Sequence, residues 1–184
     1  ETAWSGVLKT VNGDEATLSK LQEGLIGISE RAPVSANELF GLAEIAGQLG
    51  VEAPNIEKFV ETISQLGVTT NISAEQGAQS LAQFLNIFGE GTENVDRLAS
   101  SIVDCGNNFS TTEQDILNLA MRLAGVGSTV GLTEAQIIGL STAMSSVGIT
   151  AEAGGTAVST VMSKIDSAVA KGGESLDAFA QVAG

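Results

Sequence analysis

The sequence predicts an all-α fold, a compact multi-helix domain of about eight or nine short amphipathic helices. Three observations lead to this prediction. Apolar residues recur at helical spacing along most of the chain, strand-like alternation is hard to find, and only Pro33 and Pro54 interrupt the 184 residues. Apolar residues make up 43% of the chain, close to the globular norm, which argues against disorder. Because aromatic residues are only 4% and Tyr is absent, we expect a core of Leu, Ile, Val, Ala and Met.

The helices follow from the spacing of apolar residues three and four positions apart. The clearest sets are Leu39, Leu42, Ala43, Ala46 and Leu49; Ile116, Leu119, Ala120 and Leu123; and Ile137, Leu140, Met144 and Val147. The complete set of expected helices is 14–31, 35–49, 55–66, 73–88, 92–105, 112–125, 133–147, 151–170 and 173–183.

Residues that begin and end helices support these ranges. A Ser or Thr followed three residues later by Glu or Gln is typical of a capping box, and glycine commonly follows the last helical residue. The expected capping pairs are Ser35–Glu38, Ser73–Gln76, Thr111–Gln114 and Thr133–Gln136. The expected terminating glycines are Gly50, Gly67, Gly89, Gly127 and Gly148.

One pattern occurs three times: a Ser/Thr cap, a polar acceptor, apolar residues at helical spacing and a final apolar–Gly pair. The three copies are residues 35–50, 112–127 and 133–148. Two explanations stay open. The copies are related repeats, or any capped amphipathic helix that ends in glycine looks alike, which the irregular spacing between copies favours.

The chain is expected to form one domain over residues 1–184. Its most glycine-rich connections, "FGEGTEN" (88–94) and "AGVGSTVGLT" (124–133), are either hinges between subdomains or loops on a packed domain. Because it begins at Glu1 and lacks a basic start with an apolar stretch, we expect a segment of a longer chain without a secretory signal.

The chain is strongly acidic. Its 22 acidic and 8 basic side chains give a formal net charge of −14, which favours solubility and disfavours direct binding to nucleic acid or to anionic membranes. No apolar run approaches the roughly 20 residues that span a bilayer. The single cysteine, Cys105, excludes an intramolecular disulfide and fits a reducing compartment.

The residue types predict no enzyme. A Ser or Cys nucleophile needs a base, and the sequence has no His. Ser–Lys pairing would depend on Lys9, Lys20, Lys58, Lys164 or Lys171, and no spacing indicates it. Cys105 is expected to be a small buried residue near a helix end.

The acidic residues predict no metal or catalytic site. "VNGDEA" (11–16) lacks the continuation of a calcium loop and instead indicates a turn, with Asp14 near a helix start. Glu113, Asp115 and Glu152 also lie near predicted helix starts, where they complement the helix dipole better than they suggest a catalytic pair. We therefore expect no metal and no cofactor.

Gly154 and Gly155 are the candidate site residues. In "GITAEAGGTAVSTVMSKI" (148–165) they resemble a phosphate-binding turn, but no lysine follows and no strand precedes them. Because glycine inside a helix costs about 0.5–1 kcal/mol relative to alanine, we expect them to permit close packing or to act as a hinge at a helix start.

With its preceding segments, this stretch resembles the conserved core region of phage tail tape measure proteins. The similar segments, in order, are "ETAWSGVLKTVNGDEATLSKL", "LAEIAGQLGV", "IEKFVETISQLGV", "TNISAEQGAQSLAQFLNIFG", "LASSIVDCGNNFSTTEQDILNLAMRLAGVGSTVGLTEAQIIGLSTAMSSVGI" and "AEAGGTAVSTVMSKI". They cover nearly the whole chain, and the step from "GNNFSTTEQDI" to "EAGGTA" is the most specific.

The resemblance implies a mostly α-helical structural segment of a long virion protein. Such proteins occupy the tail tube lumen, set tail length during assembly and leave ahead of the genome. The implied partners are the tail tube protein, tail assembly chaperones, tail tip or baseplate hub proteins, and further copies in a trimer or hexamer. The implied locations are the virion tail and, during assembly, the bacterial cytoplasm. The family has no catalytic residues in this region to carry over.

A second function stays open at this point. The segment could be a lytic or membrane-active effector that helps breach the host envelope, using a buried carboxylate pair or an amphipathic helix.

Overall fold

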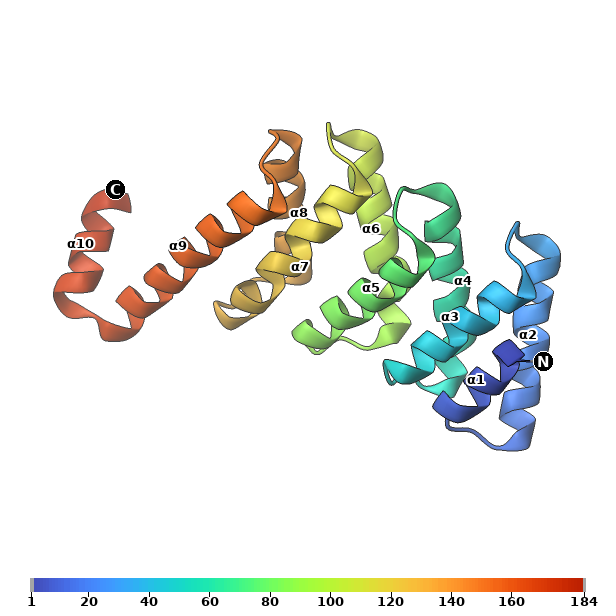
Figure 1. The fold of residues 1–184 in the computed structure, drawn as a ribbon. Coiled ribbons are helices and arrows are strands. Elements are labelled where there is room, and N and C mark those ends of the chain that lie inside the picture. The colour runs from blue at the N-terminus through green and yellow to red at the C-terminus, as the bar shows by residue number, and fades with distance from the viewer. Residues whose placement is uncertain (1, 184) are drawn as a thin grey trace. The chain divides into compact units, whose positions relative to one another are not determined.

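Residues 2–183 are described by the computed structural model, apart from the side chains of Thr2, Ser175, Phe179, Val182 and Ala183. Within that range the chain forms ten α-helices, one 3₁₀ turn and no strand, so the all-α prediction is confirmed (Figure 1). The elements are α1 (Thr2–Thr10), α2 (Glu15–Arg31), α3 (Ala36–Gln48), α4 (Ala53–Thr69), α5 (Ala74–Phe88), η1 (Thr92–Asn94), α6 (Val95–Asn108), α7 (Glu113–Thr129), α8 (Glu134–Ser146), α9 (Ala151–Lys171) and α10 (Gly173–Ala183).

Helix α1 is the one helix that the sequence does not predict. It is nine residues long and has no acidic residue in its first turn, so its own sequence gives little support to a helix. Packing against α3 supplies that support instead. Val7 is fully buried, and the rings of Trp4 and Phe40 lie 5.2 Å apart.

Three predicted terminating glycines are confirmed, and two predictions are wrong. Gly50, Gly89 and Gly148 follow helices with φ of +81°, +71° and +80°, a conformation that favours glycine. Gly67 and Gly127 instead lie inside α4 and α7, which therefore run past the predicted ends at 66 and 125.

Close helix contacts explain the two internal glycines. A Cβ on Gly67 would lie 3.0 Å from the Cβ of Ala74 at the start of α5. A Cβ on Gly127 would lie 3.0 Å from Cγ1 of Ile137 on α8. After α7, the left-handed residue is Gly131, with φ of +82°. Most of the predicted connection 124–133 is therefore helix.

The predicted caps are largely confirmed. Ser35–Glu38 and Thr133–Gln136 form complete capping boxes, and Ser73 accepts a hydrogen bond from the N–H of Gln76. Two hydrogen bonds from Ser35 also hold the pKa of the Glu38 carboxyl below its usual value. Asp14 caps α2 by accepting from the N–H of Thr17, 2.8 Å away.

The predicted capping pair Thr111–Gln114 is wrong by one residue. Thr112 caps α7, and its Oγ1 accepts from the N–H of Asp115 at 3.1 Å and donates to Asp115 Oδ2 at 2.7 Å. The adjacent Thr111 turns its hydroxyl toward the hydroxyl of Ser145 at the end of α8. The sequence offers two threonines in a row, and this contact with α8 decides between them.

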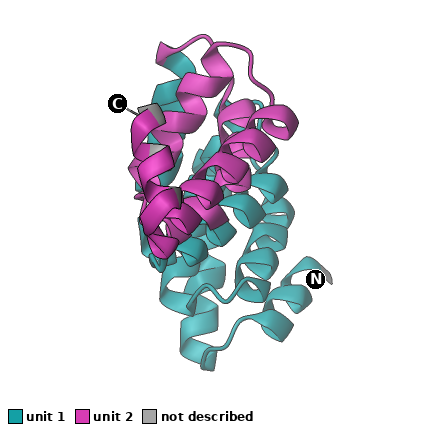
Figure 2. Ribbon diagram, turned by 90° about the vertical axis from the view of Figure 1, so that its left-hand side faces the viewer, with its two compact units in different colours: residues 1–107 teal, residues 108–184 magenta. Residues whose placement is uncertain are grey.

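The chain divides into two compact units, residues 1–107 and 108–184, which Figure 2 distinguishes by colour. In the first unit, α3 packs against α1, α2, α4 and α5, and α2 also packs against α4. The core is mostly aliphatic and also contains Phe40, which is buried, and Phe59 and Phe84, which are fully buried. Cys105, near the end of α6, is half-buried rather than buried as expected, because the buried part of α6 ends at Ile102 and the turn that follows is partly exposed.

In the second unit, α7 packs against α8 and α9, and α9 packs against α10. The two glycine-rich connections, 88–94 and 124–133, each lie inside one unit, and the division falls between Asn107 and Asn108. The hinge expected at one of these connections stays a prediction.

The helix bounds reveal an internal duplication. Adding 98 to the bounds of α2, Glu15–Arg31, gives Glu113–Thr129, the bounds of α7. The same shift converts α3 into α8 and the start of α4 into the start of α9, and α10 begins one residue after the counterpart of Ala74. It also converts the cap Asp14 into Thr112 and Gly50 into Gly148. We call α2–α5 the first copy and α7–α10 the second copy.

This shift corrects the threefold pattern that the sequence suggests. Residues 35–50 and 133–148 are counterparts, so that pair reflects duplication. Residues 112–127 are the counterpart of 14–29 instead, and they resemble the other two only as a capped amphipathic helix. Buried core positions in the two copies are also related by the 98-residue shift. Leu25 and Leu123 are counterparts, and both are fully buried.

One core position differs in chemistry between the copies. Ala43 on α3 is fully buried, and so is its counterpart Ser141 on α8. The Ser141 hydroxyl has no hydrogen-bond partner among the described residues. Burying a hydroxyl without a partner costs about 1–3 kcal/mol, so the first copy has the better residue here.

We expect Ser141→Ala to raise the free energy of unfolding by about 1 kcal/mol, because it removes an unpaired buried hydroxyl. The matched change Ala43→Ser introduces the same defect and should lower it by about 1–3 kcal/mol. Urea unfolding followed by far-UV circular dichroism measures both. A loss of stability in Ser141→Ala would mean that the hydroxyl is hydrogen-bonded in solution.

Candidate functional site at the start of helix α9

The structure places Gly154 and Gly155 near the start of α9, where both are buried. Thr150 caps this turn, and its Oγ1 accepts from the N–H of Ala153 at 3.5 Å. The pair therefore lies within a helix whose N-terminus is already capped, and it forms no loop that could surround a phosphate.

Both glycines lie where a side chain would collide with a neighbouring helix. A Cβ on Gly154 would lie 2.6 Å from Cε of Met144 on α8. A Cβ on Gly155 would lie 2.9 Å from the Cβ of Arg122 on α7. The second contact is the stricter one, because the Cβ of Arg122 is fixed to its backbone while the methionine methyl can move. Glycine at 155 therefore permits α9 to approach α7 closely.

In the first copy the glycine and the long side chain at the corresponding crossing are exchanged between the two helices. Arg122 and Gly155 are the counterparts of Gly24 on α2 and Glu57 on α4. A Cβ on Gly24 would lie 2.5 Å from Cδ of Glu57, so these two positions are also in contact. Each copy thus has one glycine and one long side chain at this crossing, on opposite helices.

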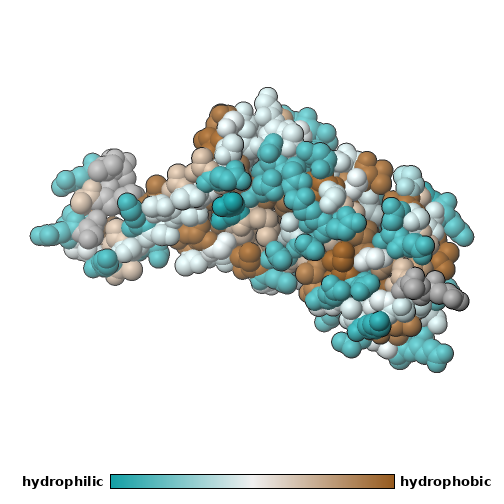
Figure 3. Space-filling view, viewed as in Figure 1, coloured by the Kyte–Doolittle hydropathy of each residue, from teal (hydrophilic) through white to brown (hydrophobic). Residues whose placement is uncertain are grey.

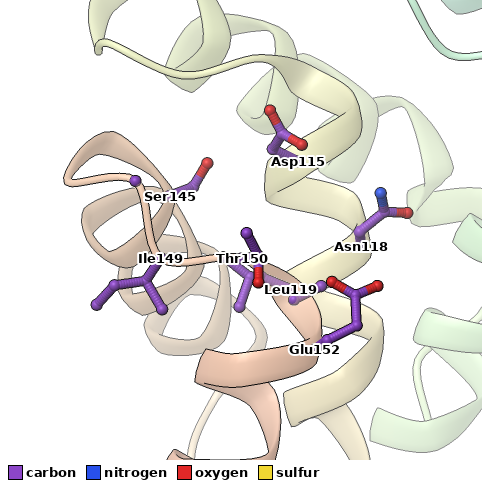
Figure 4. Close-up of a pocket in the computed structure, with 9 residues that line it drawn as sticks. Asp115, Asn118, Leu119, Ser145, Ile149, Thr150 and Glu152 are labelled. Atoms are coloured by element: carbon purple, nitrogen blue, oxygen red, sulfur yellow. The ribbon is translucent and has the colours of Figure 1, made fainter.

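A groove of about 310 Å³ lies beside the glycine pair. Figure 4 shows its walls: Asp115, Asn118 and Leu119 from α7, Ser145 from α8, Ile149 and Thr150 from the connection before α9, and Glu152 from α9. Sequence reasoning noted Asp115 and Glu152 but did not bring them together, because they come from two helices that meet only in the fold. Asn118 and Ser145 carry no sequence signal that would have identified them.

The polar groups of this groove hold helix ends and neighbouring side chains. Asp115 accepts from Thr112, and Asn118 Oδ1 accepts from Nε2 of Gln114 at 3.0 Å. Glu152 lies 3.9 Å from Nη2 of Arg122, and both side chains are at least half exposed, so the ion pair contributes at most about 1 kcal/mol. Carboxylates held in this way stabilise the start of each helix.

A second groove, of about 550 Å³, lies between α4 and α6 in the first unit. Its walls are mostly small and polar, and they contain one acidic residue, Asp104. The same two helices are also joined by an ion pair between Lys58 and Asp96, with Nζ and Oδ2 3.0 Å apart, and its hydrogen bond lowers the pKa of the Asp96 carboxyl.

The described residues contain no group of three or more Cys, Asp or Glu side chains arranged to hold a metal ion. Within the same residues, no helix combines the length and the apolar character needed to cross a bilayer. The hydropathy surface shows hydrophilic and hydrophobic residues interspersed over the face in view (Figure 3).

We expect Gly155→Ala to lower the free energy of unfolding by about 1–3 kcal/mol, because its new methyl group overlaps Arg122. Gly139→Ala is the matched control. Gly139 also lies inside a helix, but a Cβ there meets no atom within 4 Å, so the change should raise stability by about 0.5–1 kcal/mol. Thermal or urea unfolding distinguishes the two. Equal effects would contradict the close approach at Gly155.

The chain was compared with protein families, curated proteins and solved structures. The model of the phage-related minor tail protein family matches residues 22–183, which is most of the chain and includes both copies except the beginning of α2. Neither the curated proteins nor the solved structures gave a match. With capped helices, an all-α core and a family match over nearly its whole length, this chain belongs to the phage-related minor tail protein family and is a component of the phage tail.

Proposed function

We propose that this chain is a segment of a tape measure protein, which sets tail length during assembly and leaves the tube ahead of the genome. The observation that carries the proposal is the family match over residues 22–183, together with the ordered resemblance to the tape measure core. We also propose that this segment acts without catalysis of its own, since the chain has no His and its groove carboxylates serve as caps and surface ion pairs.

The duplication supports a structural role. A protein that measures length changes its reach with the number of residues it contains, and repeating a 98-residue unit is a direct way to add reach. The partners that fit this role are the tail tube protein, the tail assembly chaperones and the proteins of the tail tip or baseplate hub. Further copies of the chain, as a trimer or hexamer, would share the lumen. Assembly would take place in the bacterial cytoplasm.

The acidic surface supports a place beside DNA without binding to it. With a net charge of −14, the segment repels the phosphate backbone of the genome that later passes through the same tube. Electrostatic repulsion would keep the protein from adhering to the DNA that follows it.

The length role can be tested by deleting one repeat from the parent gene of the phage. Removing residues 15–112 joins Asp14, the counterpart of the cap Thr112, to Glu113, the counterpart of Glu15, so a cap followed by its helix is preserved. Tails should shorten by about 150 Å if the segment spans the tube as helix at 1.5 Å per residue, and by about 320 Å if it is extended. Electron microscopy of virions measures this.

The control for the deletion is Gly139→Ala in the same gene, which keeps the residue count and should leave tail length unchanged. Tails of normal length in the deletion phage would contradict the ruler role.

Because its net charge is −14, we expect that the purified chain does not bind duplex DNA even at low salt, where electrostatic attraction is strongest. A gel-shift titration at about 10–20 mM salt with a basic DNA-binding protein as positive control measures this. Retardation that disappears as salt rises would contradict the proposed repulsion.

A further inference from the structure

The two copies differ in how their last helix is packed. In the first copy, α5 packs against both α3 and α4 and buries one face, whose members are Gly77, Ala78, Leu81, Ala82, Phe84 and Leu85. In the second copy, α10 packs against α9, and its described side chains are exposed, including Leu176. In the first copy α5 therefore covers the pair α3 and α4, whereas in the second copy α10 does not cover the pair α8 and α9 in this way.

The uncovered surface is the apolar face of α9. Val161 on this face is 55% exposed, and its counterpart Ile63 on α4 is fully buried. Val158 is half-buried, and its counterpart Val60 is also fully buried. Both positions remain apolar in the second copy, although the structure leaves them open to water.

Helix α5 is what covers this face in the first copy. A Cβ on Gly77 of α5 would lie 3.2 Å from Cδ2 of Leu66 and 4.0 Å from Cδ1 of Ile63, so α5 rests directly on α4 at this point. Under the 98-residue shift, the counterpart of α5 is α10. The sequences agree in pattern, since "LAQFL" (81–85) corresponds to "FAQVA" (179–183), with apolar and small residues at the positions that α5 buries.

We propose that the apolar face of α9 is a docking surface for α10, which closes over α8 and α9 as α5 closes over α3 and α4. The arrangement in the structure, with α9 and α10 in end-to-end contact, is then the open form of this unit (Figure 1).

The connection between α9 and α10 is suited to this movement. Helix α9 is four residues longer than α4, and these four residues, 168–171, are the counterparts of the connection 70–73 in the first copy. Closing therefore requires the last turn of α9 to unwind. Gly172 and Gly173 follow it with φ of +62° and +57°, and two adjacent glycines allow the chain to change direction at low cost.

Two valines on α9 provide a matched test, because they are equally exposed in the open form. Val161 is 55% exposed and Val169 is 58% exposed, but the counterpart of Val161 is buried Ile63 while the counterpart of Val169 is exposed Asn71. Aspartate at 161 should therefore disrupt closing, and aspartate at 169 should not.

We expect Val161→Asp to accelerate amide hydrogen exchange in α10 at least about tenfold in the 184-residue chain, since burying a valine side chain is worth roughly that factor or more. Val169→Asp should change it less than about twofold. As a positive control, Ile63→Ala should accelerate exchange in α5. Equal effects of the two aspartates on α10, or no effect of either, would overturn the proposal.

Measuring the hydrogen-exchange protection of α10 at several protein concentrations identifies which helix occupies the apolar face of α9. Docking of α10 onto its own chain gives protection that does not change over a tenfold range of protein concentration. Protection that rises with concentration would overturn the assignment and point to a second copy of the chain on the same face.

Discussion

The close approach of the third helix in each copy to the first is the constraint on which the rest of the structure depends. At this crossing each copy places a glycine opposite a long side chain: Gly155 lies against the Cβ of Arg122, and Gly24 faces the flexible carboxyl end of Glu57. Once α4 lies close to α2, and α9 close to α7, short connections place the middle helix against the first. The aliphatic residues between them can then reach near-complete burial.

Local signals in the sequence predict most of the helices. Periodicity and caps act within a few residues, so Ser35–Glu38 and Thr133–Gln136 could be recognised without the fold. Features that depend on contacts with residues distant in the sequence could not be predicted in this way. Gly67 and Gly127 look like terminators until α5 and α8 are placed against them, and α1 becomes a helix only because α3 receives Trp4 and Val7.

The candidate site shows the same difference between local sequence signals and contacts with distant residues. The sequence drew attention to Gly154 and Gly155 through their composition, but the reason for glycine lies on other helices, at Met144 of α8 for Gly154 and at Arg122 of α7 for Gly155. The 98-residue duplication was hidden for a similar reason. Most of its positions keep only their apolar or polar character, and the relation becomes clear when helix bounds, caps and buried positions are compared together.

The exchanged pair also distinguishes the native helix pairs from mixed ones. Tandem copies of similar sequence are prone to misassembly, because a helix from one can take the place of its relative in the other. Helix α4 beside α7 would place Glu57 opposite Arg122, and α9 beside α2 would place Gly155 opposite Gly24. Only the native pairs, α4 with α2 and α9 with α7, place one glycine opposite one long side chain at both crossings.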